Sequence, residues 1–302
     1  MEEIVATVLF ANLISPPKMG ESLTILQYEE MLRDFQNTVY EVISHHLEFF
    51  GYEGIGVDHE LTILGDEIRV FFYSGQVQFD IRNALLMAIK IKLAWLVSPF
   101  NQRMAEEKGH LSSIGVGINC GKVIKDLRTL RVRMGHIYPN IEGYIISQTK
   151  HIQLASHEGT VSQIMVGTNF YERCRLNSRI NIAFSPQKIL NVKGLDQRIP
   201  AYEVFSFVNF EIIPSMPPPY QEGLLEKIES IMHKKVPRPW IFVILLRSYI
   251  STLAMGDDEH LSAKAVDLAQ QALKVLDYKV VIYNMLGWLY NNCKSIRSKN
   301  IP

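Results

Sequence analysis

The chain has 302 residues, of which 47% are hydrophobic, so it is long enough for one large domain or two smaller ones. Lysine plus arginine and aspartate plus glutamate each number 31, and this balance gives no electrostatic argument for nucleic acid or an anionic membrane as partner. Three widely spaced cysteines, Cys120, Cys174 and Cys293, indicate reduced thiols rather than a disulfide framework or a zinc site. The N-terminus does not resemble a signal peptide, and no apolar run reaches the about 20 residues that cross a bilayer. We therefore expect a cytoplasmic protein without a membrane span.

The first elements are a strand and a long helix. Residues 4–11 are uncharged and rich in β-branched side chains, which is typical of a buried central strand. Thr24 and Gln27 have the spacing of a capping box. Apolar residues at helical spacing then predict an amphipathic helix over residues 26–50.

Residues 61–72, LTILGDEIRVFF, predict a β-hairpin. Apolar residues flank Gly65 and Asp66, and a glycine before an acid is typical of a tight turn. The carboxylates of Asp66 and Glu67 would lie at the exposed tip, where they can hold a hard cation. Turn chemistry alone accounts for most Gly-Asp pairs, so the rest of the chain must distinguish a plain turn from a cation site.

The elements that follow continue the alternation of helices and strands. They are predicted over 79–108 (a helix that Pro99 breaks or kinks), 114–120 (a strand with close backbone approach), 138–157 (a helix), and 160–166, 188–192 and 199–207 (strands). This order predicts an α+β sandwich over residues 1–208, with helices on one face of a mostly antiparallel sheet.

The last third of the chain has a different pattern. Pro214 and Pro217–Pro219 mark residues 209–221 as a proline-rich linker. Residues 222–302 would then form a small all-α tail, with helices over 222–234, 240–254 and 262–276 and a further segment, VIYNMLGWLY.

Two spacings in this tail resemble a tetratricopeptide repeat. The aromatic, Leu-Gly and aromatic positions of a first repeat helix are matched by Tyr283, Leu286, Gly287 and Tyr290. The small positions of the preceding second helix are matched by Ala265, Ala269 and Ala272. We expect a protein partner to bind this tail; a generic amphipathic helix pair is the alternative.

Five segments of residues 4–207 together resemble a known family. In chain order they are VATVLFANL, ILGDEIRVFF, IGVGINCGKVI, IYPNIEGYIISQTKHIQLAS and LNVKGLDQRIPAYEV. They resemble the class III adenylate/guanylate cyclase catalytic domain. The resemblance implies a ferredoxin-like nucleotide cyclase sandwich that forms homo- or heterodimers. It also implies two aspartates that bind two metal ions, magnesium or manganese, with a nucleoside triphosphate.

The sequence departs from this family at most of its catalytic positions. By the resemblance, the two metal positions are Asn12 and Asp66, so a neutral amide replaces one carboxylate. The family's ribose-orienting Asn and its phosphate-stabilising Arg fall on Ser147 and His151, which are both shorter.

The nucleotide-binding positions are degenerate as well. The resemblance places the adenine-selecting Lys at Thr62 and the adenine-selecting Asp at Asn140, whereas the phosphate-binding Lys survives as Lys193. Asp66 and Lys193 alone retain the family's residue type.

Several interpretations remain open. The first is a degenerate, catalytically inactive cyclase homology domain that regulates, dimerises or senses nucleotides in cyclic-nucleotide signalling, with or without a bound metal and triphosphate. The second is one half of a heterodimeric cyclase, a phosphorus-oxygen lyase that a partner chain completes; Asn12 argues against it. The third is a nucleotide sensor that uses Asp66 and Lys193, and the fourth is an unrelated ferredoxin-like domain. We expect the first.

Overall fold

The computed structural model describes residues 1–14, 23–52, 59–109, 111–133, 136–176, 182–191, 198–207, 212, 215–233, 239–254, 256, 258–276 and 279–293. Lys193 therefore lies outside the described residues. The described chain is a mixed α+β structure whose elements follow one another largely as the sequence predicts.

The strands form a mostly antiparallel sheet of nine strands. They are β1 (Glu2–Ile14), β2 (His59–Leu64), β3 (Glu67–Phe72), β4 (Ser113–Arg133), β5 (His136–Glu142), β6 (Ile164–Gly167), β7 (Ile182–Phe184), β8 (Lys188–Asn191) and β9 (Arg198–Phe207). Their order is β2-β3-β1-β4-β6-β9-β7, with β5 paired to β4 and β8 paired to β9. Within the described residues, β4 and β6 make the one parallel pair.

The helices of the sheet half lie between its strands along the chain, and two of them begin at capping signals in the sequence. They are α2 (Ile25–Phe49), α3 (Val77–Leu96), α4 (Pro99–Lys108), α5 (Tyr144–Ala155) with the short 3-10 turn η1 (Ser156–Glu158), and α6 (Thr168–Arg175). The predicted capping box at Thr24 is present. The predicted break at Pro99 is confirmed, because Ser98 caps α4 and Pro99 takes its first turn.

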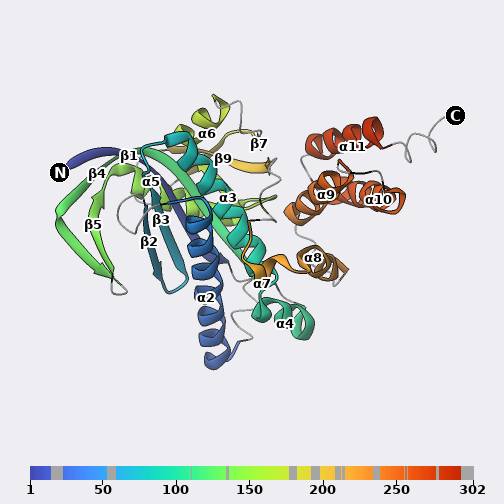
Figure 1. Ribbon diagram of the computed structural model, residues 1–302, viewed down its shortest axis with the longest axis horizontal. Coiled ribbons are helices and arrows are strands. Elements are labelled where there is room, and N and C mark those ends of the chain that lie inside the picture. Colours follow the sequence, from blue (N-terminus) through green and yellow to red (C-terminus); the bar gives the residue numbers. More distant parts are fainter. Residues whose placement is uncertain are drawn as a thin grey trace.

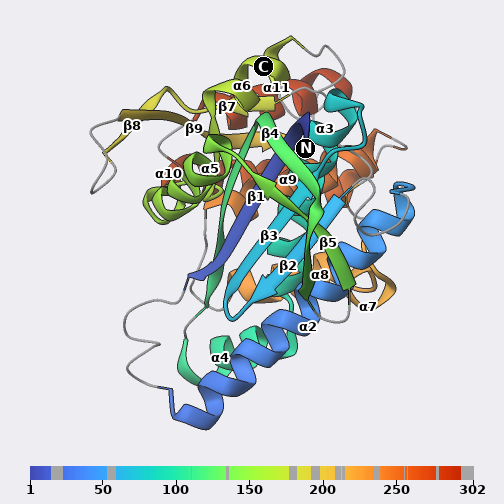
Figure 2. The same cartoon turned by 90° about the vertical axis from the view of Figure 1, so that its left-hand side faces the viewer.

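Helices cover both faces of the sheet, so the prediction of helices on one face was wrong. Alternate residues of β1 separate two apolar clusters. Leu9 and Ala11 join the cluster of α2 and α3, whereas Val8 and Phe10 join a second cluster with Ile145 of α5. Figure 1 shows α2 and α3 side by side along one face, and Figure 2 looks onto the face that carries α5.

Glycines of β4 let α5 approach the second face. A Cβ on Gly117 would lie 2.4 Å from the backbone nitrogen of Gln153, and one on Gly121 would lie 3.2 Å from the Ile145 side chain. The close backbone approach predicted for this strand is therefore confirmed.

Several boundaries differ from the sequence predictions. The strand expected over 114–120 is longer, because β4 extends to Arg133 and pairs with β5. Residues 138–142 were expected to begin a helix, but they belong to β5, because Ile141 and Glu142 pair with the extended β4. Residues 160–163 were expected in a strand, but β6 begins at Ile164, because the backbone of those residues turns around a buried carboxylate described below.

The C-terminal part of the described chain consists of helices. They are α7 (Pro218–Gln221), α8 (Leu224–His233), α9 (Pro239–Leu253), α10 (Glu259–Val275) and α11 (Val280–Asn292). Figure 1 shows α8 to α11 grouped on the α3 side of the sheet. Leu224 and Ile228 of α8 and Ile241 of α9 belong to the same buried apolar cluster as the core between the sheet and α3. The linker and tail boundaries at 209–221 and 222–302 stay predictions.

No single helix of the described residues is long and apolar enough to cross a membrane. The bent pair of α3 and α4 reaches that length and apolarity only when the two helices are taken together.

Candidate functional site

The turn between β2 and β3 places Asp66 beside the end of β1. The register pairs Asn12 of β1 with Glu67 of β3, and the N–H of Leu13 donates to the carbonyl of Asp66 at 3.2 Å. Gly65 takes a positive φ of 61°, which suits glycine in a tight turn. The structure therefore brings Asn12 and Asp66 to the same edge of the sheet, as the sequence interpretation requires.

The side chains at this edge offer little to a pair of divalent cations. The Oδ1 atom of Asn12 is buried and has no hydrogen-bond partner among the described residues, so it could accept one ligand bond. Asn12 carries no charge, and Glu67 is already ion-paired with Lys150. The described residues contain no group of three or more His, Cys, Asp and Glu side chains that could hold a metal. Because divalent oxygen sites depend on several charged ligands, these residues do not fit a two-metal centre.

An ion pair between α5 and β3 lies on the face of the sheet that α5 covers. Lys150 contacts the carboxylate of Glu67, and its Nζ lies 5.7 Å from the ring centroid of Phe10. Both ionised side chains are about one-third exposed, at 31% and 32%. The sequence analysis missed this pair, because no local pattern links residues 83 positions apart.

A second ion pair joins β3 to the neighbouring strand β2. The Arg69 guanidinium lies 5.4 Å from the Phe71 ring centroid and 6.0 Å from that of Phe10, and it is 4.0 Å from the Glu60 carboxylate. The register places Thr62 directly opposite Arg69. The position that the cyclase resemblance assigns to base selection is thus paired with a guanidinium that lies within cation–π distance of two aromatic rings.

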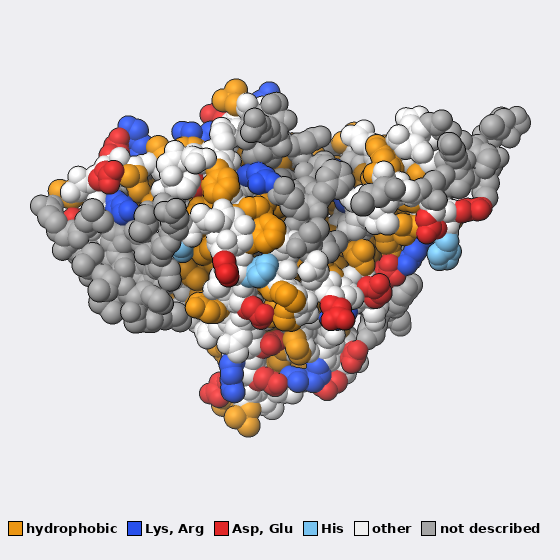
Figure 3. Space-filling model, viewed as in Figure 1, with side chains coloured by type: hydrophobic (Ala, Val, Ile, Leu, Met, Phe, Trp, Pro, Cys, Tyr) orange, Lys and Arg blue, Asp and Glu red, His pale blue; other side chains and the backbone are white. Residues whose placement is uncertain are grey.

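The remaining candidate residues are not gathered at Asn12 and Asp66. Ser147 is exposed and His151 is half-buried on α5, and no described contact joins either to those two residues. Asn140 lies on β5, where its Nδ2 donates to Glu142 at 2.6 Å. Figure 3 shows another feature of the surface: on that face, acidic and basic side chains are interspersed rather than separated by sign.

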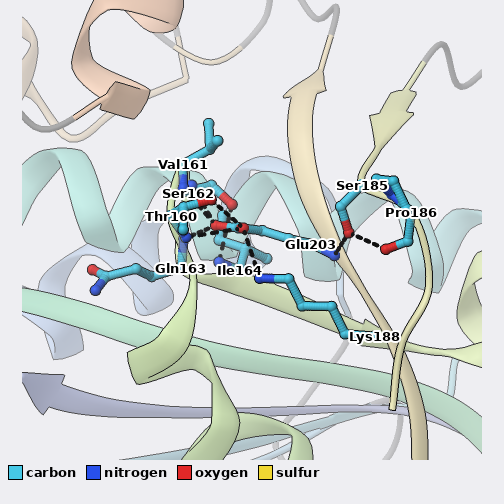
Figure 4. Close-up of polar contacts among 9 residues, drawn as sticks. All are labelled: Thr160, Val161, Ser162, Gln163, Ile164, Ser185, Pro186, Lys188 and Glu203. Carbon is cyan, nitrogen blue, oxygen red and sulfur yellow. Dashed lines mark hydrogen bonds and ion pairs between the residues drawn. The ribbon is translucent and has the colours of Figure 1, made fainter. Parts of the chain in front are cut away.

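A further polar site surrounds Glu203 of β9, which is fully buried (Figure 4). Its carboxylate accepts N–H groups from four consecutive residues: Thr160 at 3.0 Å, Val161 at 2.8 Å, Ser162 at 2.8 Å and Gln163 at 3.0 Å. The Lys188 ammonium is 3.7 Å away. A Cβ on Gly159 would lie 2.8 Å from the carboxylate, so glycine is needed there.

The Glu203 carboxylate occupies the anion site that these backbone N–H groups form. Four N–H groups that would suit a bound anion are occupied by an internal carboxylate. Glu203 therefore fixes the connection from α5 to β6, and the sequence analysis did not single it out as a site residue. Its sequence signals were its place in a segment predicted to be a strand and in the last of the five segments that resemble the cyclase family.

Comparisons with known proteins now bear on this fold. No family model matches the sequence, and no curated protein sequence matches it. The adenylyl cyclase CyaB from P. aeruginosa is similar over 68% of this chain and 95% of its own, with a TM-score of 0.51 and 18% identity. The guanylyl cyclase Cya2 is similar over 69% of this chain and 95% of its own, with a TM-score of 0.52 and 18% identity. At this level of identity the likeness concerns the fold alone: the chain folds as these two nucleotide cyclase structures do.

Proposed function

We propose that the chain is a catalytically inactive cyclase homology domain that acts as a regulatory or dimerisation module in cyclic-nucleotide signalling. The observation that carries the proposal is Asn12. Asn12 and the turn of Asp66 lie at the same edge of the sheet, and Asn12 stands where the cyclase resemblance places the first metal-binding aspartate. The fold shared with CyaB and Cya2 supports the cyclase comparison.

The loss of catalytic groups supports inactivity. Removing one group that stabilises a transition state typically lowers a rate by about 100- to 1,000-fold. Asn12, Ser147 and His151 each replace such a group by the resemblance. Such effects are not additive, but losses at three positions still leave little rate for a homodimer.

Exposed apolar residues support a role in binding other chains. Tyr144 and Leu154 of α5 are 54% and 51% exposed, and they would contribute to a dimer surface. On α11, Tyr283 is 56% exposed, and a Cβ on Gly287 would meet no atom within 4 Å. Through this exposed face of α11, the tetratricopeptide-like tail would bind a protein partner.

The experiment is a cyclase assay on the purified full chain. ATP or GTP is supplied with magnesium or manganese, and the cyclic product is measured with Asp66→Asn as the matched control. We expect product at the level of the control. Cyclic product that forms with the wild type and disappears in Asp66→Asn would overturn the proposal, because it would show that the chain is an active cyclase.

A further inference from the structure

Two side-chain cations share the sheet face beside Asn12. Lys150 comes from α5 and Arg69 from β3, and both approach the ring of Phe10, at 5.7 Å and 6.0 Å from its centroid. Each is paired with an acid, Glu67 for Lys150 and Glu60 for Arg69. This face therefore carries its own positive charges, supplied by the chain.

The register places the Lys150 ammonium next to the candidate site. Asn12 and Glu67 are direct partners on neighbouring antiparallel strands. Such partners share a face, with their Cβ atoms about 4.5–5.5 Å apart. Since Lys150 contacts the Glu67 carboxylate, its ammonium lies on the same face as the Asn12 amide and close to the turn of Asp66.

The charges at this edge differ from those of a metal site. Asp66 and Glu67 are the acids of the turn, and Lys150 neutralises one of them. Asn12 adds no negative charge, so it tolerates an ammonium nearby. A divalent cation approaching this turn would meet the fixed positive charge that Lys150 places on the neighbouring Glu67, and like charges repel.

We propose that the Lys150 ammonium takes the place of a divalent cation as the counter-charge of the Asp66–Glu67 turn. The inference rests on the proposed function in taking this turn as the family's former metal site. An ammonium neutralises a carboxylate and holds α5 against β3, but it has no coordination position for a phosphate oxygen. The Glu67 carboxylate is therefore neutralised at any magnesium concentration, and the wild-type chain has no divalent-cation site that depends on Asp66.

The test measures manganese binding to the full chain by electron paramagnetic resonance, without any nucleotide. We expect no binding to the wild type that depends on Asp66. Lys150→Met should bind manganese at least about tenfold more tightly, because it removes one positive charge from the site. Adding Asp66→Asn to Lys150→Met should abolish that gain.

The matched control is Lys122→Met. Lys122 also pairs with a glutamate, Glu3 at 2.8 Å. Lys122→Met removes one positive charge, as Lys150→Met does. Manganese binding should stay at the wild-type level in this control. If Lys150→Met does not fold, Lys150→Gln tests the same loss of charge.

Three results would overturn the proposal. One is wild-type manganese binding that Asp66→Asn abolishes. Another is a folded Lys150 variant that gains no manganese affinity, and the third is a gain equalled by Lys122→Met. Because the readout is cation binding and not turnover, an active cyclase in the assay above and a failure of this inference are separate outcomes.

Discussion

Two glutamates of this protein each meet a lysine, but in different surroundings. Glu203 is fully buried and accepts four backbone N–H groups, with Lys188 at 3.7 Å. Glu67 is 32% exposed, and the contact that defines it is with Lys150. The same pair of residue types thus serves the fold in one region and sets the charge of a surface in the other.

The two glutamates differ in the partner groups that would remain if each carboxylate were removed. Without Glu203, four N–H groups would lose their acceptor; three of them belong to the buried residues 161–163, and each unsatisfied buried group is costly. Without Glu67, water could solvate the partly exposed ammonium that remains. Stability should therefore depend strongly on Glu203 and weakly on the Glu67 pair.

The largest expected effect is that of Glu203→Ala. We expect it to lower the free energy of unfolding by about 4 kcal/mol, because the N–H groups of residues 160–163 lose a charged acceptor. Urea unfolding followed by circular dichroism measures the change. Lys188→Ala is the control and should cost less than about 1 kcal/mol, because this lysine is 35% exposed. Equal losses in both variants would contradict the distinction.

Gln153 sharpens the comparison, because it is a buried polar group without the partners that Glu203 has. It is fully buried on α5, and neither amide atom has a hydrogen-bond partner among the described residues. Gln153→Leu should therefore raise the free energy of unfolding by about 1–2 kcal/mol. Gln36→Leu is the control: it should lower stability by about 1 kcal/mol, because it loses a 2.9 Å bond to the carbonyl of Gly65. A destabilised Gln153→Leu would show that the amide is satisfied in solution.

His46 tests burial without a counter-ion. Burial first, and then the neighbouring Lys90 charge, hold the pKa of His46 well below its ordinary value of 6.5. The folded state thus favours neutral His46, whereas the unfolded state protonates it below pH 6.5. Stability from this group is full above pH 6.5 and falls as the pH drops toward the folded pKa, by at most about 1.4 kcal/mol per pH unit.

The measurement compares urea unfolding of the wild type and His46→Gln between pH 7 and pH 5. The variant should lose less stability on acidification than the wild type does. Parallel curves would mean that His46 titrates normally in the folded protein.

The smallest effect is expected for Lys150→Met. Its free energy of unfolding should stay within about 1 kcal/mol of the wild type, because ion pairs of this exposure contribute little. Thermal or urea unfolding measures this, and the manganese experiment uses the same variant. A loss as large as that of Glu203→Ala would make the Lys150–Glu67 pair a structural element of the fold.

Much of the fold could be predicted because its signals are local. Thr24 and Gln27 are three residues apart and cap α2, and Gly65 marks the turn of the hairpin. The candidate metal positions Asn12 and Asp66 were predicted from the family resemblance, and the register brings them together. The start of α5 was predicted too early, because pairing with β4 overrode the helical pattern of residues 138–142.

The features that only the tertiary structure decided involve residues far apart in the chain. Lys150 meets Glu67 across 83 positions, and Glu203 meets the loop at residues 160–163 across 40 to 43. His46 lies in the last turn of α2, yet Lys90 and the core enclose it. The sequence by itself determined most of the helices and strands and the hairpin turn, because propensity, caps and periodicity act over a few residues. The folded chain decided which charges are buried and which neutralise one another, because burial and ion pairing depend on surfaces that meet only when the sheet and helices assemble.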